Sequence, residues 1–148
     1  MGGVQQMSRA TRGVRYRANL RARYAAQLRG VSVEAAALTR GYGVDELGRV
    51  LAEFVAGYRQ RHGAGPARSQ VVAETDLLSL VGLPAPPADW PRQARAMWTE
   101  VAVSAIFQEV RRAGWLHWTR EPGSVRAGGA YADADAARGM TPAELVRR

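Results

Sequence analysis

The chain has 148 residues and no cysteine, which excludes disulfides, thiolate catalysis and zinc sites built on cysteine. Its net charge of +8 is unevenly distributed: residues 1–30 hold seven arginines and no acid, whereas residues 31–148 hold 14 arginines against 13 acids. No stretch approaches the roughly 20 apolar residues of a membrane helix, and the N-terminus lacks the apolar region of a secretory signal.

The length suits one domain with appendages. We divide it into a basic N-terminal arm (1–30), a helical domain (31–131) and a C-terminal tail (132–148). All 21 basic residues are arginine, as expected of a GC-rich bacterial coding sequence. We expect a cytoplasmic, nucleoid-associated protein, because the dense positive charge of the arm favours contact with a polyanion.

Four apolar side chains recur every fourth residue and predict a helix over about 14–29: Tyr16, Leu20, Tyr24 and Leu28. Gly30 is expected to end this helix. A short helix over 33–40 follows, with Ser32 as its N-cap, and the glycines at 41 and 43 interrupt the chain again.

The broadest amphipathic pattern predicts a helix over 44–62, and its expected buried face consists of Leu47, Val50, Leu51, Phe54, Val55 and Tyr58. Gly63–Pro66 is a clear break. Ser69 is expected to cap a helix over about 70–80, and the proline-dense segment 82–91 reads as a loop.

Two apolar stripes follow this loop and lie on opposite sides of a helix: Ala94, Met97, Trp98 and Val101 form one, and Val103, Ile106, Phe107 and Val110 the other. Either the helix breaks near residues 99–100, or one long helix is buried on two faces. A glycine at 114 ends it. A strand over 115–119, a Pro122-Gly123 turn and a second strand over 125–131 are expected next. Capping-box spacing over 141–144 predicts a short terminal helix.

The order helix, helix, helix, strand, turn, strand over about 44–131 resembles the winged helix-turn-helix superfamily. The resemblance implies a mainly α fold with a short β-hairpin wing, to which this chain adds a basic N-terminal helix. It also implies binding to double-stranded DNA, with no cofactor, metal or small-molecule substrate, by a homodimer. The proline-dense loop between the second and third helices is a departure, because the superfamily usually has a short turn there.

A second interpretation lies upstream. Ala37, Gly41 and Leu47 have the A-x3-G-x5-L spacing of helix-turn-helix units, and the segment resembles the tri-helical unit of actinobacterial helix-turn-helix proteins. A recognition helix would then begin at about 44–49. We favour the winged interpretation, because the helix over 44–62 has the broad apolar face of a core helix.

Side chains that suit bases and phosphates gather in four segments, since Gln matches adenine, Arg matches guanine, and Arg or Ser binds phosphate. The predicted DNA contacts are Arg9, Arg12, Arg15, Arg17, Arg21 and Arg23 in the arm; Arg68 and Ser69 at a helix start; Ser104, Gln108, Arg111 and Arg112 on the third helix; and Arg120 and Arg126 beside the wing turn. Trp98 is the best candidate for a partner or dimer surface.

The sequence contains no P-loop, nucleophile elbow, zinc-protease motif or dinucleotide-binding glycine pattern, and we do not expect an enzyme. His62 and His117 have no metal-ligand spacing. The pattern indicates a transcriptional regulator or a mobile-element accessory factor. Two alternatives stay open: a structural or interaction protein that oligomerises through its helices, and an RNA-binding or ribosome-associated factor.

Overall fold

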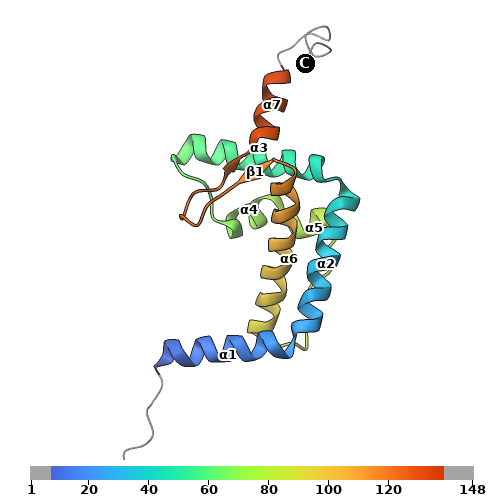
Figure 1. The fold of residues 1–148 in the computed structure, drawn as a ribbon, viewed down its shortest axis with the longest axis vertical. Helices are drawn as coiled ribbons and strands as arrows, with labels where there is room; N and C mark the ends of the chain where they lie inside the picture. The colour runs from blue at the N-terminus through green and yellow to red at the C-terminus, as the bar shows by residue number, and fades with distance from the viewer. Residues whose placement is uncertain (1–7, 139–148) are drawn as a thin grey trace, which may run out of the picture.

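The computed structural model describes residues 8–138, which form seven helices and one two-stranded sheet (Figure 1). In chain order the elements are α1 (Arg9–Arg23), α2 (Ala25–Tyr42), α3 (Val44–His62), α4 (Arg68–Thr75), α5 (Leu77–Val81), α6 (Arg92–Arg112), β1 (Leu116–His117), β2 (Arg126–Ala127) and α7 (Gly129–Arg138). The mainly helical class is therefore confirmed. Within these residues no helix combines the length and the apolar character needed to cross a membrane.

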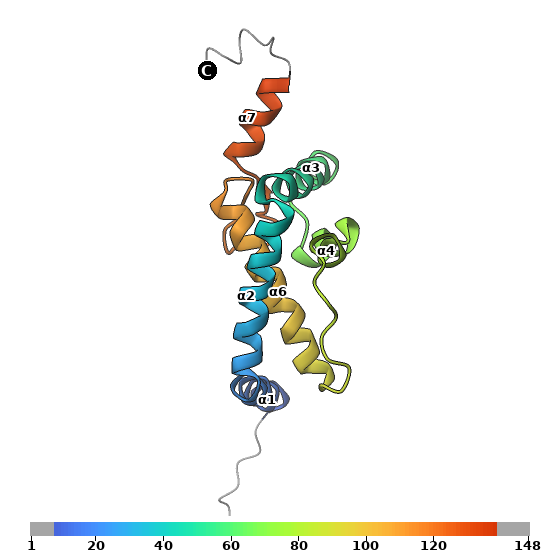
Figure 2. The same cartoon turned by 90° about the vertical axis from the view of Figure 1, so that its right-hand side faces the viewer.

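Helices α2 and α6 lie side by side along the long axis and form the most extensive helix pair (Figures 1 and 2). Helix α1 crosses the lower ends of both and projects beyond them. At the other end α3 runs across the top, with α4 and α5 packed below it, and α7 points away from the body. The short hairpin lies against α3.

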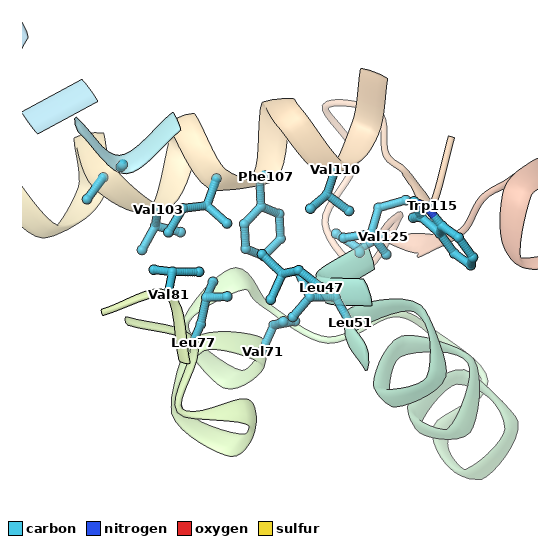
Figure 3. Packing of buried hydrophobic residues seen from close by; sticks show 14 of the residues in the cluster. Leu47, Leu51, Val71, Leu77, Val81, Val103, Phe107, Val110, Trp115 and Val125 are labelled. Atoms are coloured by element: carbon cyan, nitrogen blue, oxygen red, sulfur yellow. The ribbon is translucent and has the colours of Figure 1, made fainter. Parts of the chain in front are cut away.

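The main core lies between α6 on one side and α3, α4 and α5 on the other (Figure 3). Phe107 of α6 points into it and meets Leu47 and Leu51 of α3 with Val71 and Leu77 from the two short helices; all five side chains have no exposed surface. A second, smaller cluster joins α1 and α2 to the first half of α6 through Leu20, Leu28 and Met97.

Helix α6 is continuous and buried on two faces, which settles the alternative that the two stripes left open. Its second stripe packs on α1 and α2 through Met97, and on both clusters through Val101. Trp98 belongs to this contact: its ring meets that of Trp90 edge to face with the centroids 5.6 Å apart. Trp98, predicted as a partner surface, thus packs within the chain, and its ring is half-buried there.

Helix boundaries before residue 44 differ from the predicted ones. The first helix ends at Arg23, and a single helix α2 then passes through Gly30 and Gly41, so the expected domain boundary after residue 30 lies inside α2. Packing of Val31 and other α2 side chains against α6 offsets the poor helix propensity of the two glycines. The turn lies at Gly43, whose φ of 114° suits glycine.

This continuous α2 also removes the basis of the upstream helix-turn-helix interpretation. Ala37 is exposed and cannot mediate a close helix crossing, and Gly41 lies within the helix with open space beside its Cα. Leu47 is fully buried in the main core. Helix α3 has the predicted boundaries and the predicted apolar face, except that Val50 is 39% exposed.

The expected helix over 70–80 begins earlier and is split in two. Asp76 has a left-handed conformation, with a φ of 50°, and separates α4 from α5. Ser69 is not the N-cap: Ala67 occupies that position, and its amide donates a hydrogen bond of 2.8 Å to the side chain of Gln70. Arg68 is consequently the first residue of α4.

The hairpin has the expected turn but shorter strands, with Leu116 opposite Ala127 and His117 opposite Arg126. The second strand was expected to continue to residue 131, but it ends at Ala127 because α7 begins at Gly129. The amide of Gly128 instead donates to the carbonyl of Trp115 at 2.7 Å. The terminal helix predicted at 141–144 lies outside the described residues.

Candidate nucleic-acid interface

The outer face of α6, opposite its main core stripe, is largely covered by α2. Ala105 at the centre of this face is half-buried and packs against the main core. Ser104 is half-buried, whereas Gln108 and Arg112 are exposed. The surface of α6 that could contact DNA is thus narrower than the sequence predicts. It consists of one edge of the helix and not of a whole face.

This edge faces a groove of about 700 Å³ between α6 and the first two helices. Arg21 of α1 and Arg29 of α2 line the groove from one side, and Ser104, Gln108 and Arg112 line it from α6. The structure therefore brings an arm residue, Arg21, together with three predicted residues of α6. Arg29 was counted in the basic arm but was missed as a contact, because its place opposite α6 depends on α2 being continuous.

The two acids that line the groove are engaged in ion pairs. Glu109 lies 3.0 Å from Arg40 and 3.5 Å from Arg112, and its side chain is only 15% exposed. Glu100 lies 3.3 Å from Arg17 at an exposed position. Among residues 8–138, no carboxylate lies within 4.0 Å of Arg21 or Arg29. The guanidinium groups of Arg21 and Arg29 can therefore pair with an external anion.

A second basic cluster joins α4, α6 and the hairpin. The guanidinium carbons of Arg68 and Arg111 lie 5.0 and 4.4 Å from the centroid of the Trp118 ring, which are cation–π distances. Trp118 is buried and meets Phe107 edge to face at 5.9 Å, so the platform for both cations is anchored in the core. We call these three residues the Arg68–Trp118–Arg111 cluster.

Two like charges converge in this cluster. Among residues 8–138, no carboxylate lies within 4.0 Å of either guanidinium. Burial lowers the pKa of Arg68, and the positive charge of Arg111 lowers it further. Arg68 donates to the hydroxyl of Ser104 at 3.4 Å, which links the cluster to the exposed edge of α6. An anion bound here would relieve the repulsion between the two cations.

The other predicted residues surround these two features without forming part of them. Arg9, Arg12, Arg15 and Arg23 are exposed on α1. Ser69 is exposed next to Arg68 on α4. Arg120 is exposed in the loop between the strands, and Arg126 on β2 lines a cavity that Arg111 also lines. Sequence reasoning placed Trp118 in a half-buried strand but did not identify it as the support for two arginines.

Arg59 was also missed, because nothing in its local sequence indicates its contact. This α3 residue donates from Nη1 to the carbonyls of Gly123 and Val125 at 3.0 and 3.1 Å, and so holds the hairpin turn. The Gly65 amide donates to the Gly123 carbonyl at 2.8 Å on the same segment. The hairpin thereby has a fixed position relative to α3 and to the segment that precedes α4.

No group of three or more His, Asp or Glu side chains within residues 8–138 is arranged to hold a metal ion. Comparisons of the chain with protein-family models, with curated proteins and with solved structures gave no match. The geometry and charge of the two basic features are therefore the basis for assigning a function.

Proposed function

We propose that the protein binds double-stranded DNA through a winged helix-turn-helix unit, as a transcriptional regulator or a mobile-element accessory factor associated with the nucleoid. The observation that carries this proposal is the Arg68–Trp118–Arg111 cluster, because two cations converge there on a rigid support and no carboxylate within residues 8–138 pairs with either. Arginine is the side chain best suited to grip phosphate in a fixed geometry.

The arrangement of the elements supports the winged part of the proposal. Helices α3, α4 and α6 precede the hairpin in the order typical of winged units, and α6 leads into β1 within four residues. The Gly65–Gly123 hydrogen bond also joins the segment that precedes α4 to the hairpin turn. The cluster lies where these parts meet, at the junction of α4, α6 and Trp118, which directly follows β1.

Base contacts would come from the exposed edge of α6. Gln108 and Arg112 have side chains that can form paired hydrogen bonds with adenine and guanine, and Ser104 suits phosphate. The coverage of α6 by α2 leaves only this edge for reading bases. We therefore expect each protein chain to recognise a short DNA sequence. A homodimer would extend the recognised DNA by reading a second half-site.

The projecting helix α1 would supply affinity without sequence preference. Its arginines are exposed around the helix, and it extends beyond the ends of α2 and α6 (Figure 1). A solvated helix of 15 residues is marginal by itself, so contact with phosphates would also stabilise its projecting half. The groove beside Arg21 and Arg29 would continue this basic surface towards α6.

A gel-shift titration of the full chain on genomic fragments tests the proposal. We expect binding at low salt that weakens steeply as salt is added, because bound phosphates release counterions. Absence of a shift at low salt would contradict DNA binding. Competition between duplex DNA and single-stranded RNA of equal length separates the proposal from an RNA-binding function; preference for RNA would contradict it.

A further inference from the structure

A third cavity, of about 510 Å³, lies between α4 and α6 on the other side of the exposed edge. Its volume is within the range of small-molecule sites. Val72 and Ala73 of α4 and Val103 of α6 supply apolar surface, and Arg68 supplies a positive charge. We infer that this cavity binds a small organic carboxylate, with its carboxylate on Arg68 and its apolar body between α4 and α6.

The guanidinium of Arg68 is held in a fixed position and has hydrogen-bond donors available for such a ligand. Trp118 and Phe107 hold it by stacking, at 5.0 and 5.4 Å from the ring centroids. Within residues 8–138 its one hydrogen-bond acceptor is the hydroxyl of Ser104 at 3.4 Å. Most of its five N–H groups therefore have no acceptor in this part of the chain, and a carboxylate can accept from two of them side by side.

The residues that line the cavity determine which kind of group can carry the carboxylate. Val72 and Val103 have no polar side-chain atom, so they favour an apolar body over a second charged group. The acid at the rim, Glu100, is paired with Arg17 and would repel a doubly charged anion more than a singly charged one. A monocarboxylate with an aromatic or aliphatic body fits these requirements better than inorganic phosphate.

Binding of the ligand would oppose binding of DNA, and this consequence rests on the proposed function. Arg68 cannot hold a ligand carboxylate and a DNA phosphate at full strength at the same time. The ligand would therefore act as an effector that lowers the affinity for DNA, with the two equilibria coupled through one guanidinium.

The direct test is titration of the full chain, without DNA, with phenylacetate and hexanoate by calorimetry and ligand-observed NMR. We expect at least one of them to bind with a Kd of about 1 mM or tighter. Phenylacetamide, which lacks the charge, and acetate, which lacks the body, should bind at least about tenfold more weakly. No saturable binding of either carboxylate, or equal binding of the amide, would overturn the inference.

Variants locate the site. Arg68→Ala should weaken carboxylate binding at least about tenfold, as should Ala73→Trp, which fills the cavity from an exposed position on α4. Thr99→Phe fills it from α6 and serves if Ala73→Trp does not fold by circular dichroism. Arg49→Ala is the matched control, since Arg49 also stacks on a tryptophan, Trp115 at 5.6 Å, but lines none of the cavities described here. Unchanged binding in the first three variants would overturn the inference.

A last titration separates this inference from the proposed function. Saturating carboxylate should raise the apparent Kd for duplex DNA in the wild-type chain but not in Ala73→Trp. If the carboxylate binds with the variant dependence given above and DNA affinity does not change, the ligand site stands and the assignment of Arg68 to DNA binding is wrong.

Discussion

Gly48 and Trp115 are in such close contact that a Cβ atom on the glycine would overlap the indole ring. The same indole donates from Nε1 to the carboxylate of Asp45 at 2.8 Å, one turn earlier in α3. Helix α3 and the segment that enters the hairpin are therefore joined by a close apolar contact and a hydrogen bond. The position of the hairpin, and with it the Arg68–Trp118–Arg111 cluster, depends on this junction.

Gly48→Ala should destabilise the protein by about 1–3 kcal/mol, because the overlap with Trp115 outweighs the gain in helix propensity. Urea unfolding followed by circular dichroism measures the change. The matched control is Gly30→Ala in α2, where a Cβ meets nothing within 4 Å. The control should be stabilising by about 0.5–1 kcal/mol; equal effects of the two substitutions would contradict the proposed contact.

Arg59→Met should loosen the hairpin turn, since it removes the hydrogen bonds to the carbonyls of Gly123 and Val125 while retaining most of the aliphatic stem. We expect a loss of about 1–2 kcal/mol in stability and faster hydrogen exchange at the Gly65 amide, which donates to the same Gly123 carbonyl. Arg61→Met on the same helix is the control, because Arg61 is exposed. Unchanged exchange at Gly65 would count against the role of Arg59.

The helix over 44–62 was predictable to the residue because each of its determinants is local. A glycine precedes it and another follows it, acids lie in its first turn, cations lie in its last, and its apolar stripe is broad. The two stripes around residue 100 were visible as well. Their explanation depended on tertiary packing: the contacts of α6 with α1 and α2 explain why its second face is also apolar.

Features that depend on contacts distant in sequence could not be predicted. Tertiary packing keeps α2 helical through Gly30 and Gly41, against local propensity. The left-handed Asp76 that splits the predicted helix has no strong local signal. The cation–π contacts of Trp118 bring together α4, α6 and the hairpin from residues 68, 111 and 118, so no spacing in the sequence reveals them.

Neutralising the arm should weaken binding to all DNA sequences alike. The triple variant Arg9→Gln/Arg12→Gln/Arg15→Gln should lower the magnitude of the salt slope by up to about 3, because each phosphate contact contributes about 0.9. Anisotropy titrations on two unrelated duplexes at several salt concentrations measure it. The control neutralises Arg49, Arg61 and Arg138, which line none of the described cavities. A selective effect on one duplex would show that the arm reads sequence.

Arg112→Ala should instead reduce discrimination between a preferred site and its single-base variants, by about 1–3 kcal/mol at the position that Arg112 contacts. Arg40→Ala is a close control, since Arg40 and Arg112 both pair with Glu109 but only Arg112 lines the groove. Competition binding with a library of site variants gives the comparison. If both substitutions relax specificity to the same extent, the effect belongs to Glu109 and not to base contact by Arg112.

The most direct test of DNA binding through the Arg68–Trp118–Arg111 cluster is the salt dependence of duplex binding by Arg68→Gln/Arg111→Gln, compared with Arg49→Gln. We predict that the double variant folds, that it binds at least about tenfold more weakly at low salt, and that its salt slope is lower in magnitude by about 2. Arg49→Gln should match the wild type, although it removes an arginine that also stacks on a tryptophan. A folded double variant with wild-type affinity and slope would contradict DNA binding through this cluster.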